Sequence, residues 1–483
     1  GYATLAAQNF TTATDVYNVA VGFHAGNAVT TGQYNTLIGG LAGDSITTGD
    51  HNVALGVSCL QANTTANKNV ALGSNALSSF NVTTDTDTYN TAVGYAAGTA
   101  VSTGVQNTLI GGISGDALTG GYYNVALGHS SLTSDTVGYG SVSIGTGTLA
   151  AQNFTTATWT YNTAVGYAAG AAVTTGVSNT LIGAAAGDAI TTASYNTAVG
   201  FNSLSSDTLG ARSTAVGYNA LNAQNFTTDT SVYNTAVGFA AGVAVTDGFY
   251  NTLIGGLAGD ALTDADYNTA VGQAALTTDD LGSRSTAIGQ GSLHSQNSAT
   301  AVITYNTGMG FQTGYYNVTG TGNTYVGYSC GYGVSGNSNS SNTGMGRQAM
   351  QGITTGDLNT CIGFAAGISI TSGDNNIFLG GDTGRAGSPG GAITTGSNEI
   401  VIGDENITEA HVQVDWTIAS DQRDKTDVEP MEMGLDFVNK LEPVTYKWDK
   451  RSLYVEKGEN FRDLVPDGTH KEDWLDTGFL AQD

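Results

Sequence analysis

The sequence predicts an all-β fold, a repetitive β-solenoid or β-roll fibre, followed by a small α+β domain at the C-terminal end. A short motif returns every 17 to 23 residues along the first 400 residues or so, as in proteins built from stacked repeats. Its β-branched residues lack helical spacing. Only 4 prolines occur in 483 residues, which fits a chain whose backbone N–H groups are needed for ladders.

The motif reads Asn or Ser, then Thr or Val, a small or apolar residue, an aliphatic residue and Gly. We count 22 copies, the last of which starts at Glu399, and all of them have Gly four residues after the first position. Steps of 17, 17, 17 and 21 residues build a block of 72 residues. The blocks start at Asn18, Asn90, Asn162, Asn234 and Asn306. The sequence thus divides into regular repeats (1–305), less regular coils (306–405), a transition (406–419) and a C-terminal domain (420–483).

Each copy is expected to supply one coil, made of a strand of about five residues, a turn, a second short strand and a second turn. Coils stacked about 4.8 Å apart would rise on the order of 100 Å in total. The fixed Gly permits a positive φ or a close approach of two backbones. The Asn tolerates left-handed geometry, and stacked Asn side chains can bond from coil to coil.

The strand of each coil is apolar on both faces. We expect the aliphatic residue before Gly to form an interior column, and the residue before it, such as Ala20 or Leu37, to point to the opposite face. A strand that is apolar on both faces needs cover on both sides. We therefore expect the coils to pack against other copies of the chain around an axis, as a homotrimer.

The repeat resembles the head domain of trimeric autotransporter adhesins, whose coils are similar to the strings SVSIG at Ser141 and STAIG at Ser285. It also resembles shaft segments of phage tail fibres. The resemblance covers residues 1 to about 405. It implies a fibre and does not imply a particular ligand.

The longer step in each block inserts four residues and brings the strings AQNFTTAT or AQNFTTDT, with Phe10, Phe154 and Phe226. Loops on a rigid scaffold often carry binding residues. These rings are therefore possible surface contacts to a glycan or receptor. A Phe packed against a neighbouring chain is the alternative.

Other side chains point to no metal or cofactor. An Asp recurs at 72-residue spacing, but a Ca²⁺ site needs several converging oxygens, so one carboxylate per block is more typical of a turn cap. These residues are Asp44, Asp116, Asp188 and Asp260. The three cysteines form no CxxC pair, and Cys361 is expected to be a small buried side chain in a strand.

The net charge of −26 argues against nucleic acid, which needs clustered Lys and Arg, and against anionic lipid. No apolar run approaches the 18 residues of a membrane span. The first ten residues, GYATLAAQNF, match the middle of a later repeat, so we expect further sequence upstream.

The chemical character of the chain changes near Ser420. Residues 1–419 carry 24 acidic and 5 basic side chains, whereas residues 420–483 carry 16 and 9. The string MEMGLDFVNKL has the spacing of a short amphipathic helix, and EPVTYKW that of a strand. Taken alone, Ser420 and Asp421 are typical of a helix N-cap, and Lys425 is typical of a surface residue.

The strings SDQRDK, GLDFVNKLEPVTYKW and GFLAQD follow one another in residues 420–483. They resemble the C-terminal intramolecular chaperone domain of phage endosialidases, tail spikes and tail fibres. In that family the domain helps three chains to assemble and then cuts itself off. The family pattern continues beyond AQD, so we expect the domain to be incomplete in this sequence.

The resemblance assigns roles to individual residues. Ser420 would be the nucleophile that attacks the carbonyl of Ala419, and Lys425 would be its general base. Asp421 and Arg423 belong to the same motif, and the positive charge of Arg423 would lower the pKa of the lysine. The cleavage site would thus lie between Ala419 and Ser420. This is a single-turnover maturation step, and no chemistry on an external substrate is apparent.

The sequence therefore predicts a structural and adhesive tail fibre or spike of a phage virion that engages the host surface. Its expected partners are two further copies of itself, upstream tail proteins and a host receptor or glycan. A polysaccharide depolymerase is one alternative, although no acidic pair outside the repeat suggests a cleft of that kind. A trimeric adhesin on a bacterial cell surface is the other.

Overall fold

The computed structural model describes residues 1–412, 444–447, 467–471 and 476–478. The chain divides into two compact units, Gly1–Glu409 and Ala410–Asp483, which are described separately. The described residues form strands, turns and loops, with no helix among them. Within this part of the chain, nothing has the length and hydropathy of a membrane-crossing helix.

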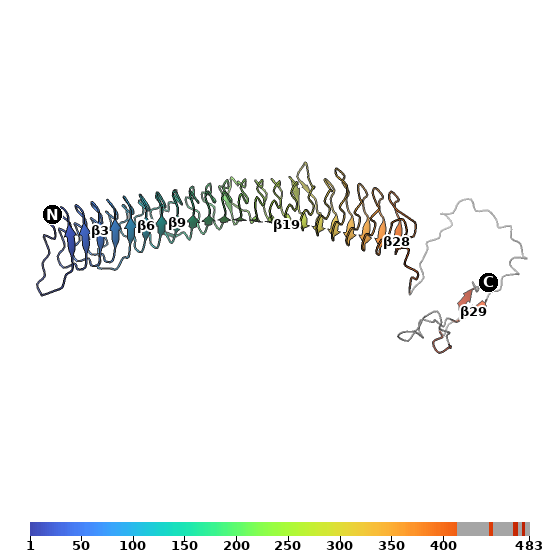
Figure 1. Cartoon of the computed structure of the whole chain (residues 1–483), viewed down its shortest axis with the longest axis horizontal. Coiled ribbons are helices and arrows are strands. Elements are labelled where there is room, and N and C mark those ends of the chain that lie inside the picture. The colour runs from blue at the N-terminus through green and yellow to red at the C-terminus, as the bar shows by residue number, and fades with distance from the viewer. Residues whose placement is uncertain (413–443, 448–466, 472–475, 479–483) are drawn as a thin grey trace, which may run out of the picture. The chain divides into compact units, whose positions relative to one another are not determined.

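The first unit contains 22 strands of three residues each, stacked in one parallel sheet from β1 to β28 (Figure 1). These strands are β1 (Val19–Val21), β2 (Thr36–Ile38), β3 (Val53–Leu55), β4 (Val70–Leu72), β5 (Thr91–Val93), β6 (Thr108–Ile110), β7 (Val125–Leu127), β9 (Val142–Ile144), β11 (Thr163–Val165), β12 (Thr180–Ile182), β13 (Thr197–Val199), β15 (Thr214–Val216), β17 (Thr235–Val237), β18 (Thr252–Ile254), β19 (Thr269–Val271), β21 (Thr286–Ile288), β23 (Thr307–Met309), β24 (Thr324–Val326), β25 (Thr343–Met345), β26 (Thr360–Ile362), β27 (Ile377–Leu379) and β28 (Ile400–Ile402).

Each of these strands begins one residue after the first position of a motif copy, so the 22 copies and the 22 strands coincide. Pairing is in direct register: Val19 lies opposite Thr36, and Thr36 lies opposite Val53. Equivalent residues of successive coils therefore form columns along the stack. The predicted all-β solenoid is confirmed.

The expected second strand in every coil is wrong, and the main strands are shorter than the predicted five residues. Outside the main sheet, the first unit has only three two-residue parallel ladders and a bridge between Asn67 and Asp87. All four occur at the 21-residue coils, where the inserted residues reach the coil below. The ladders join β8 (Gly138–Tyr139) to β10 (Thr158–Trp159), β14 (Gly210–Ala211) to β16 (Thr230–Ser231), and β20 (Gly282–Ser283) to β22 (Val302–Ile303).

The first residue of each motif copy forms a buried ladder, which we call the ladder asparagines. Asn35 Nδ2 donates to the carbonyl of Gly49 at 2.8 Å, which closes its own coil. The backbone N–H of Asn35 in turn donates to Asn18 Oδ1 at 2.9 Å, which joins it to the preceding coil. Each side chain thus satisfies one donor and one acceptor that burial would otherwise leave unpaired.

The Gly at the fixed position cannot be replaced by a residue with a side chain. At Gly111, φ is +137°, and a Cβ would overlap the carbonyl oxygen of Gly128 in the next coil. The same positive φ and the same close approach recur at equivalent glycines along the stack. Both predicted reasons for the Gly, positive φ and close backbone approach, apply at once.

The interior column was assigned to the wrong residue. The middle residue of every strand after β1, for example Leu37 or Ala54, is buried, whereas the aliphatic residue before Gly points outward. We call the buried middle residues the inner column. Both positions are apolar, so hydrophobicity alone could not separate them.

The size of the side chain in the inner column is related to the size of the residue six positions later, because both share the same interior space. A Cβ on Gly26 or Gly43 would come within 2.7 and 2.8 Å of the Leu37 methyl groups. In the first coil of a block, the inner column has alanine and the later position has Gly26; in the third and fourth coils, alanine is followed by leucine at this position, as at Leu60 and Leu77. Both sets belong to one buried cluster. The four-coil period of the sequence is therefore a packing period.

Tyr325 is a fully buried tyrosine in the inner column of β24. Its neighbours in that column are Gly308 and Gly344, which leave room for the ring. The hydroxyl donates to the Asn339 side chain and, at 3.2 Å, to Asn323 Oδ1. Burial raises the pKa of this phenol well above its usual value.

A buried polar network occurs where Ser replaces a ladder asparagine. Gln224 Nε2 donates to Asp207 Oδ2 at 2.5 Å and to Ser213 Oγ at 3.0 Å. Asp207 Oδ1 accepts the backbone N–H groups of Gly210 and Phe226. The carboxylate has no cationic partner, and burial raises its pKa. The equivalent sets are Asp135, Ser141 and Gln152, and Asp279, Ser285 and Gln296.

In the second unit, β29 (Val444–Tyr446) and β30 (Asp476–Gly478) pair as antiparallel strands. The strand predicted from EPVTYKW is thereby confirmed as β29. The helix predicted from MEMGLDFVNKL lies outside the described residues.

Candidate functional site: the strand face and the C-terminal segment

The first and third residues of the 22 strands point outward and form one surface, which we call the strand face. Its third residues form an unbroken apolar row of Val, Ile, Leu or Met, and its first residues are Thr in 15 strands and Val or Ile in the other seven. At its start, Val19 and Val21 are 49% and 56% exposed. Almost every exposed large apolar side chain of the described residues lies on this face or on the two columns that flank it. The exceptions are Trp159, Val302, Ile303, Val334, Ile407 and Val412. An apolar surface that runs the full length of a stack marks an interaction site.

The residue before each ladder asparagine forms the first flanking column, which we call the leading column. It adopts a left-handed backbone in coil after coil, although it is often tyrosine, as at Tyr233 and Tyr250 with φ of 55° and 57°. Bulky residues rarely adopt this conformation. The rings of Tyr233, Tyr250 and Tyr267 stack with centroids 5.5 and 5.1 Å apart. The left-handed turn thus holds a row of rings at the edge of the strand face.

Basic residues interrupt this row of rings without breaking the stack. The Arg212 guanidinium lies 5.3 Å from the Tyr195 centroid and 5.7 Å from the Tyr233 centroid. Arg284 occupies the equivalent place between Tyr267 and Tyr305. A cation over an aromatic face is attracted by the ring quadrupole, so the stack accepts either kind of side chain.

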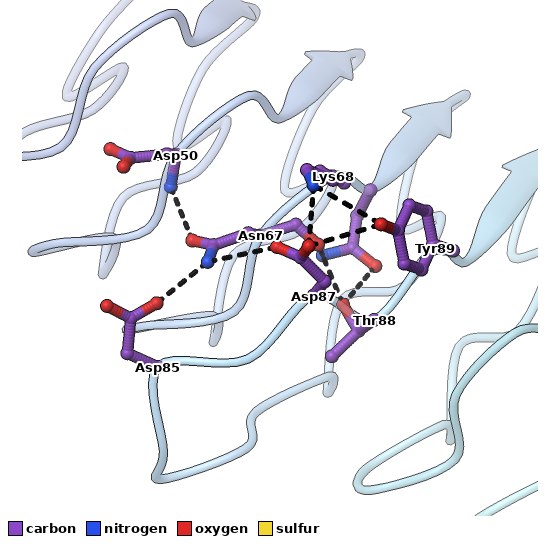
Figure 2. Close-up of polar contacts among 8 residues, drawn as sticks. Asp50, Asn67, Lys68, Asp85, Asp87, Thr88 and Tyr89 are labelled. Atoms are coloured by element: carbon purple, nitrogen blue, oxygen red, sulfur yellow. Dashed lines mark hydrogen bonds and ion pairs between the residues drawn. The ribbon is translucent and has the colours of Figure 1, made fainter.

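Lys68 occupies the leading column in the first block (Figure 2). Its ammonium group donates to Asp87 Oδ2 at 2.5 Å and to the Tyr89 hydroxyl at 3.2 Å. The hydrogen bond from Lys68 is the largest cause that lowers the pKa of the Asp87 carboxyl, and the Tyr89 hydroxyl, which donates to the same carboxylate at 3.1 Å, lowers it further. The side chain of Asn67 extends this group, because its Nδ2 donates to Asp87 at 3.5 Å and to Asp85. Its Oδ1 accepts the backbone N–H of Asp50.

In three of the four long coils, one residue of the longer loop contacts the leading column next to the preceding coil. Asp87 pairs with Lys68, and Ser231 accepts a hydrogen bond from Arg212. Where the leading column has only Gly140, Trp159 fills the gap and stacks against the neighbouring rings of the row.

The residue after each fixed Gly forms the second flanking column, which we call the trailing column. Phe201, Tyr218 and Phe239 stack here with centroids 5.6 and 5.3 Å apart. Among the described residues, the stack has five basic side chains up to residue 412, and four of them lie in the leading or trailing column: Lys68, Arg212, Arg284 and Arg347. Sequence reasoning missed both columns. The recurrence of aromatic residues directly before Asn and directly after Gly could have revealed them.

The predicted loop contacts Phe154 and Phe226 are only 6% and 7% exposed, because their rings pack on their own chain. The backbone N–H groups of both residues donate to the buried Asp135 and Asp207. Phe10, in the first such loop, is half-buried. Contact between these loops and a host surface stays a prediction.

Two of the four repeated Asp residues bond along the stack, whereas Asp44 Oδ1 and Asp188 Oδ1 are buried without a hydrogen-bond partner. Asp116 and Asp260 accept hydrogen bonds from the hydroxyls of Thr133 and Thr277, one coil further on. In the described part of the chain, no three His, Cys, Asp or Glu side chains converge in a manner suited to a metal ion. Cys361 is buried in β26 as predicted.

The predicted cleavage residues Ala419, Ser420, Asp421, Arg423 and Lys425 lie outside the described residues. Their geometry is therefore not part of the site described above, and their roles stay predictions.

Residues 420–483 match the protein family described as the chaperone of endosialidase. No curated protein is significantly similar to the chain. The same holds for solved structures. The matched segment begins at the serine predicted to be the nucleophile and covers the part of the chain that follows the solenoid. The chain therefore combines a long β-solenoid with a C-terminal segment similar to an endosialidase-type assembly chaperone.

Proposed function

We propose that this chain is a structural and adhesive homotrimeric tail fibre or spike of a phage virion, assembled by its C-terminal segment. The family match over residues 420–483 carries the proposal, because a chaperone of this family implies trimer assembly and self-cleavage. The strand face supports it independently. Its apolar row of third residues runs along all 22 coils, and only an elongated partner can cover it.

Assembly in this scheme begins at the C-terminal segment. Parallel pairing of distant residues is slow, and a stack of similar coils can pair with its copies in several registers. A segment that first gathers three chains fixes their relative level before the strand faces meet. The solenoid then forms outward from a defined starting point.

Cleavage follows from the chemistry of the matched motif. Ser420 Oγ attacks the carbonyl carbon of Ala419 while Lys425, in its neutral form, takes the hydroxyl proton. The Ala419–Ser420 amide bond breaks, its nitrogen takes up a proton, and an ester links the two residues. Water then hydrolyses the ester. The products are a carboxylate at Ala419 and a separate segment that starts with Ser420.

The experiment compares the full chain with Ser420→Ala. Light scattering should give three times the 49.0 kDa chain mass, less the released segments. A denaturing gel should show the shorter chain for the parent and the full-length chain for the variant. A monomer would contradict the assembly role, and normal processing of Ser420→Ala would contradict the nucleophile. Release of oligosaccharide from host capsule by the purified trimer would favour a depolymerase.

A further inference from the structure

We infer that neighbouring chains of the trimer meet along a seam in which the leading column of one chain packs against the trailing column of the next, coil for coil. This inference rests on the proposed homotrimer and adds the contact between its chains. Each edge of the strand face thus contacts a second copy of this chain, and equivalent coils of the two copies lie side by side.

Symmetry sets which edges meet. Because the strands stack in parallel, each runs across the stack, from the leading column on one side to the trailing column on the other. Three copies with their strand faces toward a common axis follow one another head to tail. The trailing edge of each copy then faces the leading edge of the next. A closed threefold ring also returns to its starting level, so any axial shift between neighbours must be zero.

The residues that this rule brings together are complementary. The first coil of every block places an aromatic residue at both edges, for example Tyr161 with Tyr167 and Tyr233 with Phe239. Aromatic pairs stabilise a contact beyond the burial of their surface.

In the second coil of a block, a small residue stands at one or both edges. Tyr250 is matched by Gly256, and Gly322 is matched by Tyr328. In these two coils a tyrosine therefore meets a glycine across the seam.

The charges of the two columns agree with the same pairing. Arg212 is matched by Tyr218, which belongs to the trailing-column stack of Phe201, Tyr218 and Phe239. Among the described residues, an acidic side chain enters these two columns only at the last coil, at Asp404. No coil in this part of the chain sets two like charges against each other across the seam.

The left-handed backbone of the leading column is a second reason to expect contact between this column and a neighbouring chain. A bulky residue is strained in this conformation, and the conformation recurs at exposed tyrosines such as Tyr161 and Tyr233. The stacked rings turn their faces to one another along the column, so their edges point away from it. Edge contact with the rings of a neighbouring chain would offset that strain.

Paired cysteines test the seam in the full chain. Tyr233→Cys with Phe239→Cys places one thiol at each edge of the same coil. Within one chain these positions flank a strand about 15–20 Å apart, whereas a disulfide needs Cα atoms within about 7 Å. Any disulfide between them must therefore join two chains. Burial raises the pKa of the native Cys59 and Cys330 thiols to about 12, which limits background oxidation.

Oxidation of this double variant should give a covalent trimer on a non-reducing denaturing gel, and each single variant should stay monomeric there. The control pairs Tyr233→Cys with Tyr167→Cys, which lies one block away in the trailing column, about 19 Å along the stack. It should give no covalent trimer. The pair Tyr161→Cys and Tyr167→Cys repeats the matched test in another block and guards against a local folding defect.

Covalent trimer from the mismatched pair, or covalent dimer from a single variant, would overturn the seam. A trimer by light scattering with no cross-link from either matched pair would also overturn it, while leaving the proposed function intact. A monomer by light scattering would overturn both.

Discussion

Asn35 Oδ1 accepts the backbone N–H of Asn52 at 2.9 Å, one coil further along the stack. This bond joins coils through a side chain and not through the strand ladder, and it recurs from coil to coil. Ser141, Ser213 and Ser285 replace the asparagine, and at each of them a buried glutamine supplies the missing amide.

Replacement of a ladder asparagine should open the stack locally. In Asn251→Ala, the carbonyl of Ala265 and the N–H of Asn268 each lose a buried partner, at a cost of about 1–3 kcal/mol for each group. Hydrogen exchange should speed up in the coils on either side of residue 251 and stay unchanged several coils away. Thr48→Ala, at an exposed turn, is the matched control, and equal exchange in both variants would contradict the role of the ladder.

Two glycines of one coil should respond differently to the same substitution. Gly111→Ala puts a Cβ onto the Gly128 carbonyl at a positive φ, whereas a Cβ on Gly120 meets nothing closer than 3.5 Å. We expect Gly111→Ala to cost more than 3 kcal/mol and to yield little soluble protein, and Gly120→Ala to behave as the parent. Soluble yield and thermal unfolding measure both. Equal behaviour would show that adjacent coils can separate at Gly111 without loss.

The buried network should tolerate substitution only when Asp207, Ser213 and Gln224 are replaced together. Asp207→Asn leaves a donor facing a donor, because Gln224 and two backbone N–H groups all donate to Asp207. The expected loss is about 1–3 kcal/mol. The first block carries Asn63, Asn69 and Phe80 in the equivalent places.

The triple variant Asp207→Asn, Ser213→Asn, Gln224→Phe should therefore be more stable than Asp207→Asn alone. Hydrogen exchange around residue 207 distinguishes the two. A triple variant less stable than the single one would mean that the sets depend on other parts of their blocks.

Mild acid should stabilise the stack. Burial raises the pKa of Asp135, Asp207 and Asp279, so the folded state binds protons at a pH where the unfolded state has released them. Stability therefore rises as the pH falls through the folded pKa values, and levels off near the unfolded value of about 3.9. Thermal unfolding between pH 7 and pH 4.5 measures this. The rise should persist in high salt, which screens the net charge of −26; its loss in salt would assign the effect to surface repulsion.

A crowded pair around Tyr325 gives a rescue test. A Cβ on Gly344 would lie 2.6 Å from Cys330 Sγ and 3.2 Å from the Tyr325 ring. Gly344→Ala should destabilise the coils around β25 by roughly 1–3 kcal/mol. Adding Cys330→Ala removes the closer clash and should restore part of the loss. Thermal unfolding of the single and double variants measures this recovery. If the losses of stability from the two substitutions simply add, the Cys330 sulfur does not limit the space at residue 344.

Much of the fold could be predicted because the same residue types return at the same positions of each coil. Gly at the fixed position has a steric cause that acts in every coil, and the ladder asparagine has a hydrogen-bonding cause, so both survive as a readable pattern. The inner column could not be identified in this way, since Leu37 and Ile38 are both apolar and only packing shows which is inside. The left-handed tyrosines were also hidden, because tyrosine has no preference for that conformation.

The network around Asp207 could have been predicted from the spacing of its residues. An Asp six residues before the substituted Ser and a Gln eleven residues after it recur together in three blocks. The cleavage residues are a different case: a resemblance of the segment, and not a physical pattern in it, singles out Ser420 and Lys425.

The alternation of Gly26 and Gly43 with Leu60 and Leu77 limits how such a shaft can change in length. Removing only the second coil of a block would take away Leu37, whose methyl groups fill the space beside Gly26, and would leave a void there. Deleting residues 163–234 instead joins Asn162 to Thr235 and preserves the order of coil types. Gene duplication or loss in increments of four coils, about 19 Å each, therefore keeps every packing neighbour, so the reach of the shaft can vary in discrete steps.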